Sequence, residues 1–115
     1  MAYTEKFQNM ANAARARVEE VLPEHVDALV AKGAIALDIR DKPEHDVDHI
    51  PGSLNISRGK LEMLVEGEVP DLDSTILCYC NAINRGALSA DTLRSMGYGN
   101  AKFIVGGLIA YRALS

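Results

Sequence analysis

Apolar residues along this chain fall into two patterns. In some segments they stand on consecutive positions, which is typical of strands buried on both faces of a parallel sheet. In others they recur every three or four positions, which is typical of helices with one buried face. The consecutive runs predict strands at residues 34–39, 53–56, 75–79 and 101–105, with a shorter strand at 18–22. The spaced pattern predicts helices at residues 4–17, 23–32, 60–65, 85–96 and 108–114.

The first predicted helix begins after Thr4, whose hydroxyl can accept a hydrogen bond from a free N–H group of the first turn. The apolar residues that follow at helical spacing are Phe7, Met10, Ala11, Ala14 and Val18. Such an apolar stripe is normally buried against another surface, which could be the rest of the domain or a partner chain. The sequence leaves both arrangements open.

Strands that alternate with helices predict right-handed crossovers between parallel strands. We therefore expect an α/β fold of three layers, with a central, mostly parallel sheet of about five strands and helices on both faces. The 115 residues are enough for a single domain. Within it we assign residues 1–20 to an additional N-terminal helix and residues 21–115 to the core.

Charge and composition narrow the range of partners. The net charge is −4 and the basic residues form no stripe, so we expect no nucleic-acid partner. No apolar run could span a bilayer, and Glu5 and Lys6 stand where a secretory signal would need an apolar stretch. Cys78 and Cys80, at the upper edge of disulfide geometry in a strand, are expected to be reduced thiols. These features predict a cytoplasmic protein with no membrane partner.

The strongest chemical signal is Cys80, which ends the predicted strand at 75–79, while Arg85 opens the next helix. Ligands bind at the carboxyl ends of parallel strands, and a helix N-terminus favours negative charge. A cysteine placed there tends to be a thiolate, which attacks electrophiles. We predict that Cys80 is the nucleophile and that Arg85 contacts an anion. The residues whose backbone N–H groups would surround that anion are Asn81, Ala82, Ile83, Asn84, Arg85 and Gly86.

Three motifs, in this order, resemble a single-domain rhodanese, which has a sulfurtransferase fold. The first reads LDIR at 37–40, then Glu44, then HIPGSLNI at 49–56, and is similar to the family's "DVR…E…GHIPGAINI" signature. The second is LCYC at 77–80 with Arg85, which is similar to the family's active-site loop. The third is VGG at 105–107 with Tyr111, where the family usually has a glycine pair and a later tryptophan. The resemblance covers about residues 34 to 112.

The resemblance implies a mechanism. Cys80 would attack the outer sulfur of thiosulfate or of a persulfide donor and would then carry a persulfide. A thiol or cyanide acceptor, or an acceptor protein, would remove that sulfur in a ping-pong cycle. No metal and no organic cofactor is implied. The resemblance also suggests that Asp38 and Arg40 brace the rim of the site, although the two could simply form an ion pair at a strand end.

One position departs from the family's loop. The third residue after the cysteine is commonly glycine, but here it is Ile83, and β-branched residues resist left-handed backbone angles. Either the loop follows another path or Asn84 takes the unusual conformation. Since Arg85 is also the one basic side chain in the loop, we expect weak use of thiosulfate and a preference for a less charged persulfide donor.

Two other functions remain open. Cysteine-dependent phosphatases and arsenate reductases use a similar loop that is one residue longer between cysteine and arginine, so the spacing from Cys80 to Arg85 favours sulfur over a tetrahedral oxyanion. Rhodanese-like domains that lack the cysteine act as non-catalytic binding modules. Cys80 argues against that role, and Ile83 keeps it open because a distorted loop could be inactive.

Several other residues have simpler explanations. A polar loop contains residues of the types that bind metals, namely His45, Asp46, Asp48 and His49. Polar loops collect such residues in any case, so we expect no metal there and a structural hydrogen bond from His49. Cys78 is expected to belong to the core. The pair Gly106-Gly107 is expected to allow close packing or a turn.

Overall fold

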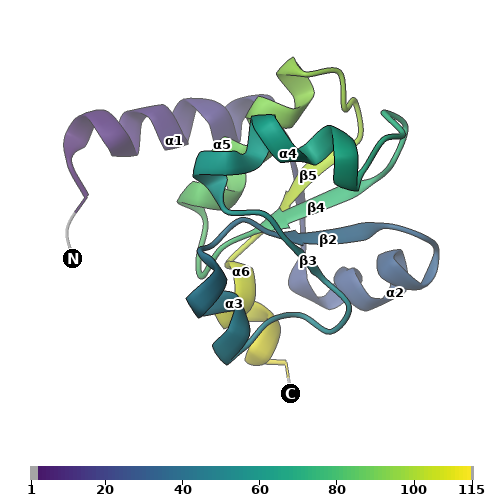
Figure 1. The fold of residues 1–115 in the computed structure, drawn as a ribbon. Coiled ribbons are helices and arrows are strands. Elements are labelled where there is room, and N and C mark those ends of the chain that lie inside the picture. The colour runs from purple at the N-terminus through teal and green to yellow at the C-terminus, as the bar shows by residue number, and fades with distance from the viewer. Residues whose placement is uncertain (1–2, 115) are drawn as a thin grey trace.

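Within residues 3–114, five strands form one parallel sheet in the order β1-β5-β4-β2-β3 (Figure 1). The structure is a computed structural model that describes these residues. The strands are β1 (Glu19–Val21), β2 (Ile35–Asp38), β3 (Leu54–Asn55), β4 (Ile76–Tyr79) and β5 (Ala101–Ile104). The predicted α/β fold with a parallel sheet of about five strands is therefore confirmed.

Helices cover both faces of the sheet (Figure 1). On one face lie α4 (Leu61–Glu68) and α5 (Asn84–Ser95), with α1 (Glu5–Arg17) packed against α5. On the other face lie α2 (Val26–Ala31) and α6 (Gly107–Arg112), with α3 (Lys42–Val47) beside α6. Short 3-10 turns span Pro23–His25 and Arg58–Lys60. In residues 3–114, no helix combines the length and the apolar character that a membrane span needs.

The central strand β4 decides on which face the candidate nucleophile lies. Successive side chains of a strand point to opposite faces. Ile76 and Cys78 belong to the cluster under α4 and α5, whereas Leu77 and Tyr79 belong to the cluster under α2 and α6. Cys80 continues the first series and packs in the same cluster as Cys78. The catalytic candidate therefore faces α5.

The segment 42–49 contains α3, a helix that was not predicted from the sequence. Asp41 is its N-cap, and the Glu44 carboxylate accepts a hydrogen bond from the Asp41 backbone N–H at 3.0 Å. A reciprocal arrangement of this kind stabilises a helix start without any apolar residue. Because α3 has no buried residue, it lacks the apolar spacing from which the other helices were predicted.

The N-terminal helix α1 packs on its own domain. Thr4 caps it as predicted, since its hydroxyl accepts a hydrogen bond from the Phe7 N–H at 3.2 Å. Ala11 and Ala14 are buried against Leu88 of α5. Met10 is 60% exposed, so the predicted apolar stripe was too wide on this side. Small residues at the contact let the two helices approach closely.

Candidate active site

Cys80 lies where β4 ends and just before α5 begins. Its residue is 4% exposed and packs in the cluster that contains Ala87, with Ile83 against it. Ile83 is the N-cap of α5, so the four residues 80–83 connect strand and helix. The thiol therefore lies at the N-terminal end of a 12-residue helix, as the sequence predicted.

The backbone of the loop is oriented by α6. The carbonyl oxygens of Cys80 and Asn81 accept hydrogen bonds from the N–H groups of Leu108 and Ile109, at 2.9 and 3.2 Å. In a trans peptide the N–H points opposite to the carbonyl. The N–H groups of Asn81 and Ala82 therefore point away from α6, toward the face on which the Cys80 side chain lies.

The N–H groups of this loop form no hydrogen bond within the described residues. Among residues 3–114, no backbone N–H of residues 81–86 donates a hydrogen bond to a protein group. Successive free N–H groups in a turn or at a helix N-terminus can form an anion-binding concavity. The loop is thus suited to an anionic sulfur or a small oxyanion, and its role in binding remains a prediction.

Gly107 allows the close approach between α6 and the loop. Its φ is +56°, and a Cβ placed on it would overlap the carbonyl oxygen of Cys80. Gly106, with φ +75°, makes the turn that leads into α6. The expected use of this glycine pair for close packing and a turn is confirmed.

Ile83 fits the loop without a left-handed conformation. Its φ and ψ are −128° and −50°, and no non-glycine residue in the described chain has a positive φ. Of the two alternatives for this loop, the unusual conformation at Asn84 is therefore excluded. Asn84 instead begins α5 and exchanges side-chain hydrogen bonds with Gln8 of α1. The glycine common in the family's loop is dispensable for this backbone path.

Arg85 is paired with Glu44 of α3. Its Nη1 and Nη2 donate to the two carboxylate oxygens at 3.0 and 3.1 Å, a bidentate geometry. Arg85 lowers the pKa of Glu44, and Glu44 in turn raises the pKa of Arg85. Each side chain is 35% exposed. The cation predicted to contact an anion is therefore already neutralised by a carboxylate.

Glu44 was not predicted as a site residue. It appeared in the sequence only as one letter of the first motif. A sharper signal was available in the spacing of Asp41 and Glu44, because an N-cap followed three residues later by glutamate indicates a helix start. That helix carries Glu44 across to the loop after β4.

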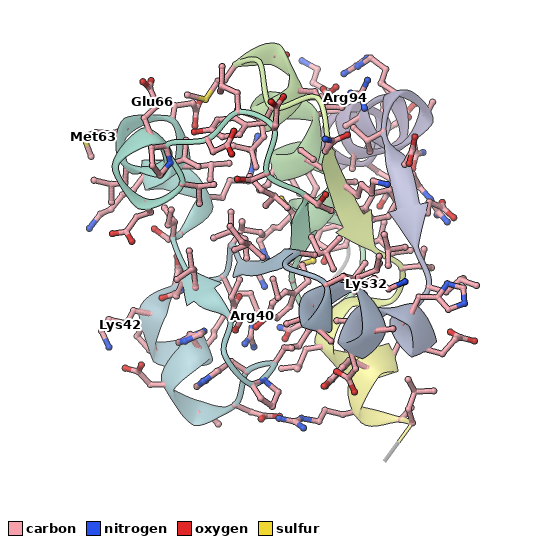
Figure 2. All side chains as sticks on the ribbon, turned by 90° about the vertical axis from the view of Figure 1, so that its right-hand side faces the viewer. Lys32, Arg40, Lys42, Met63, Glu66 and Arg94 are labelled. Carbon is pink, nitrogen blue, oxygen red and sulfur yellow. The ribbon has the colours of Figure 1, made fainter. Side chains whose placement is uncertain are left out.

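Asp38 and Arg40 form a buried ion pair at the end of β2. The Asp38 carboxylate accepts from Arg40 Nε at 2.9 Å and from Nη2 at 2.7 Å, and both side chains are almost fully buried. Arg40 Nη1 donates to the Asn81 side-chain oxygen at 3.0 Å. Figure 2 shows Arg40 inside the molecule and Lys42, two residues later, extending into solvent. The pair thus reaches the active-site loop through one hydrogen bond.

The pKa of Asp38 reflects two opposed effects. Burial raises it, but the hydrogen bonds from Arg40 and His45 outweigh burial and hold the pKa below its ordinary value. The carboxylate therefore stays ionised and keeps Arg40 in place. Cys78 behaves differently, because complete burial in the core raises the pKa of its thiol with no compensating hydrogen bond.

The polar residues that resembled a metal site by composition form hydrogen bonds and ion pairs with other protein groups. His45 Nδ1 lies 2.9 Å from Asp38 Oδ2, and His49 Nδ1 lies 2.8 Å from the carbonyl oxygen of His45. The structural hydrogen bond expected of His49 is thereby confirmed. Asp48 pairs with Arg112. Residues 3–114 contain no group of three His, Cys, Asp or Glu side chains placed to hold a metal ion.

A cavity of about 380 Å³ lies beside Cys80. One side is formed by the loop residues 80–85, and the other by Tyr3, Phe7 and Gln8 at the start of the chain. No feature of the sequence indicated that these three residues reach the site. Phe7 belongs to the predicted apolar stripe, which indicates a buried face but not the surface that it covers, whereas Tyr3 and Gln8 lie outside that stripe.

Comparison with known proteins agrees with this geometry. The family model for the Rhodanese-like domain matches residues 22–114. The chain belongs to the rhodanese family. The match begins after α1, so this helix lies outside the part that defines the family.

Relatives in the rhodanese family carry the names of sulfurtransferases. The chain is 29% identical over 94 residues to the thiosulfate sulfurtransferase GlpE of Pseudomonas fluorescens strain SBW25, covering 82% of this chain and 84% of the relative. It is 31% identical to the adenylyltransferase and sulfurtransferase UBA4 of Yarrowia lipolytica, covering 79% of this chain but 23% of that protein. These relatives support a sulfurtransferase activity, which needs a sulfur donor and an acceptor.

Solved structures extend the likeness to the whole chain. A protein of unknown function from Rhodopseudomonas palustris CGA009, described as a possible tyrosine phosphatase, is 30% identical with a TM-score of 0.83. The alignment covers 99% of this chain and 94% of that one, so it includes α1. The human single-domain sulfurtransferase TSTD1 has the same fold, with a TM-score of 0.78 and 24% identity over 85% of this chain and 98% of that one.

Proposed function

We propose that this rhodanese-family protein is a sulfurtransferase that carries sulfane sulfur as a persulfide on Cys80. The observation that supports this most strongly is the position of Cys80 directly before the loop 81–86, whose backbone N–H groups donate to no protein group within residues 3–114. Such N–H groups stabilise the negative charge of a thiolate before the reaction and of a persulfide after it.

In the first step the Cys80 thiolate attacks the outer sulfur of the donor. A bond forms between Sγ and that sulfur, while the bond between the donor's two sulfurs breaks and its electron pair leaves with the remainder. Thiosulfate would release sulfite, and a persulfide would release a thiolate. In the second step a thiol, cyanide or an acceptor protein attacks the outer sulfur of the Cys80 persulfide and restores the thiolate. No step needs a metal or an organic cofactor.

The donor in this proposal is a persulfide rather than thiosulfate. Arg85, the one basic side chain of the loop, is engaged in two hydrogen bonds by Glu44. A doubly charged donor would have to compete with that carboxylate, whereas a less charged persulfide needs only the backbone amides. Reduced thiols of this kind are maintained in the cytoplasm, where we propose that the protein works.

Intact mass spectrometry tests the proposal directly. The protein is incubated separately with thiosulfate and with cysteine persulfide, freed of donor, and weighed. We expect one added sulfur on the wild type and none on Cys80→Ser, with Cys78 unmodified in both. If neither donor leaves an adduct, the proposal is contradicted and a non-catalytic binding module is favoured.

Phosphatase activity is the second candidate, because the structural relative from Rhodopseudomonas palustris is described as a possible tyrosine phosphatase. The pairing of Arg85 with Glu44 argues against it, since a phosphate would meet a carboxylate beside the cation. The assay is hydrolysis of p-nitrophenyl phosphate. Turnover that disappears in Cys80→Ser, without sulfur loading in the wild type, would decide for the phosphatase.

A further inference from the structure

The cavity beside Cys80 has a wall that the rhodanese-like core does not supply. Tyr3, Phe7 and Gln8 precede residue 22, where the match to the family begins, yet they line the same cavity as the loop 80–85. In Figure 1 the start of α1 projects beyond the N-terminal end of α5 on that face of the molecule. The N-terminal segment, residues 3–8, therefore contributes to the cavity beside Cys80.

This wall is fixed at several points along α1. Near its start, Gln8 and Asn84 exchange two side-chain hydrogen bonds, at 3.1 and 3.4 Å. At its end, Arg17 donates two hydrogen bonds to Asp91, at 2.6 and 2.9 Å. Buried small residues of α1 pack against Leu88 between these two ends. Because all three contacts are with α5, they hold the start of α1 beside the loop that leads into α5.

The wall is aromatic and uncharged. The rings of Tyr3 and Phe7 lie 5.2 Å apart, centroid to centroid, with their planes tilted by 47°. Gln8 adds an amide, and Arg85, the single charged residue of the lining, is neutralised by Glu44. Pockets for small organic ligands begin at about 300 Å³ and are mostly apolar with few polar groups. A cavity of about 380 Å³ is larger than an inorganic sulfur anion requires.

We propose that Tyr3 and Phe7 bind the apolar body of a small organic persulfide and thereby select it over inorganic donors. This inference rests on the proposed sulfurtransferase function and names its donor class. The persulfide RSSH gives its outer sulfur to the Cys80 thiolate, the bond between its sulfurs breaks, and RS⁻ leaves. The aromatic wall contacts R, so its contribution depends on the donor having an organic body.

The test compares two donors across three proteins. Initial rates of sulfur loading on Cys80 are measured by intact mass with benzyl persulfide and with thiosulfate, for the wild type, Tyr3→Ala and Met10→Ala. Met10 lies on the same helix, is 60% exposed and does not line the cavity. We expect wild type and Met10→Ala to have the same ratio of second-order rate constants for loading by the two donors. In Tyr3→Ala the ratio should shift about tenfold away from benzyl persulfide.

The outcomes separate this inference from the function on which it rests. If neither donor loads sulfur on the wild type, the proposed function fails. If both donors load sulfur but Tyr3→Ala leaves the ratio unchanged, the function stands and the aromatic wall is refuted. Tyr3 precedes α1 and is 58% exposed, so its removal leaves the fold intact. Phe7→Leu serves as the second variant, with a far-UV circular dichroism melt to verify folding, and should shift the ratio in the same direction.

Discussion

Glu44 decides how much positive charge the active-site loop offers to a substrate. Its two carboxylate oxygens accept hydrogen bonds from the guanidinium of Arg85, and one of them also accepts from the side-chain Nδ2 of Asn81 at 3.4 Å. We expect a carboxylate in this position to favour weakly charged donors. It also orients the arginine, since a bidentate pair fixes the plane of the guanidinium.

Glu44→Gln should therefore improve the use of thiosulfate. Removing the carboxylate charge leaves Arg85 free to contact the anion, and a partly exposed ion pair contributes up to about 1 kcal/mol, which corresponds to about fivefold in kcat/KM. Steady-state kinetics with thiosulfate measures the change. Asp46→Asn is the matched control, because it removes the same charge from the same helix at a side chain that pairs with Lys42 instead. An equal rise in both variants, or a fall in Glu44→Gln, would contradict this role.

Asp38 is a second residue whose charge is held by its surroundings. Its pKa is lowered in the folded protein, so the ionised form stabilises the fold at pH values above the unfolded pKa of about 3.9. This contribution is lost as the pH falls through the folded pKa. The acid limb of the stability curve thus reports on the contact between Asp38 and Arg40.

Asp38→Asn should lower the free energy of unfolding at pH 7 by about 3 kcal/mol, because it leaves Arg40 buried without its partner. The difference from wild type should shrink below about pH 4, where the Asp38 carboxyl of the unfolded chain begins to be protonated, and further as the pH falls through the lower folded pKa. Urea denaturation at pH 7 and pH 3 measures both values. Asp73→Asn, at an exposed position, should leave the free energy of unfolding unchanged at both pH values. A deficit that is equal at both pH values would show that shape, not charge, is responsible.

At the scale of elements, the loop after β4 is positioned by helices on three sides. Its carbonyls bond to the start of α6, its last residues begin α5, and its arginine pairs with α3. The contact with α6 is the tightest, because it is possible only with glycine at position 107. The orientation of the loop amides therefore depends on a residue far from Cys80 in the sequence.

Gly107→Ala should displace the loop and reduce sulfur transfer by at least about tenfold. The new Cβ would overlap the Cys80 carbonyl, and alanine at a positive φ destabilises a fold by more than about 1 kcal/mol. Activity with the better donor and a thermal melt together measure the effect. Gly99→Ala is the control, since nothing lies within 4 Å of its added Cβ. Full activity in Gly107→Ala would refute the idea that α6 orients the loop.

At the scale of the whole molecule, one sheet joins two apolar layers. Leu77 of β4 lies in the layer under α2 and α6, and Leu93 of α5 lies in the layer on the opposite face. Neighbouring residues of β4 contribute to both layers. Because both layers pack on this one strand, unfolding of either layer should also remove the support of the other. The domain should unfold as one cooperative unit.

Leu77→Ala and Leu93→Ala should each lower the free energy of unfolding by about 2–5 kcal/mol, as for other leucines removed from a core. In each variant, urea transitions followed by far-UV circular dichroism and by tyrosine fluorescence should coincide. Met63→Ala should have little effect, because Met63 is 74% exposed and extends outward from α4 (Figure 2). Separate transitions for the two probes in either core variant would exclude a single cooperative unit.

The sequence by itself determined the alternation of strands and helices, the parallel sheet and the place of Cys80 at the end of β4. These features depend on local periodicity and on the order of elements, which a single chain displays directly. The short helix α3 escaped prediction because capping by Asp41 and Glu44, rather than an apolar face, stabilises it.

Only the tertiary structure decided what surrounds the thiol. Glu44 reaches Arg85 across 41 positions, and Gln8 reaches Asn84 across 76. Such contacts depend on the crossing of whole elements, and side-chain periodicity carries no information about them. The pairing of Arg85 with Glu44 and the aromatic wall of the pocket are not apparent from any motif, and these two features are the physical basis for the donor that we propose.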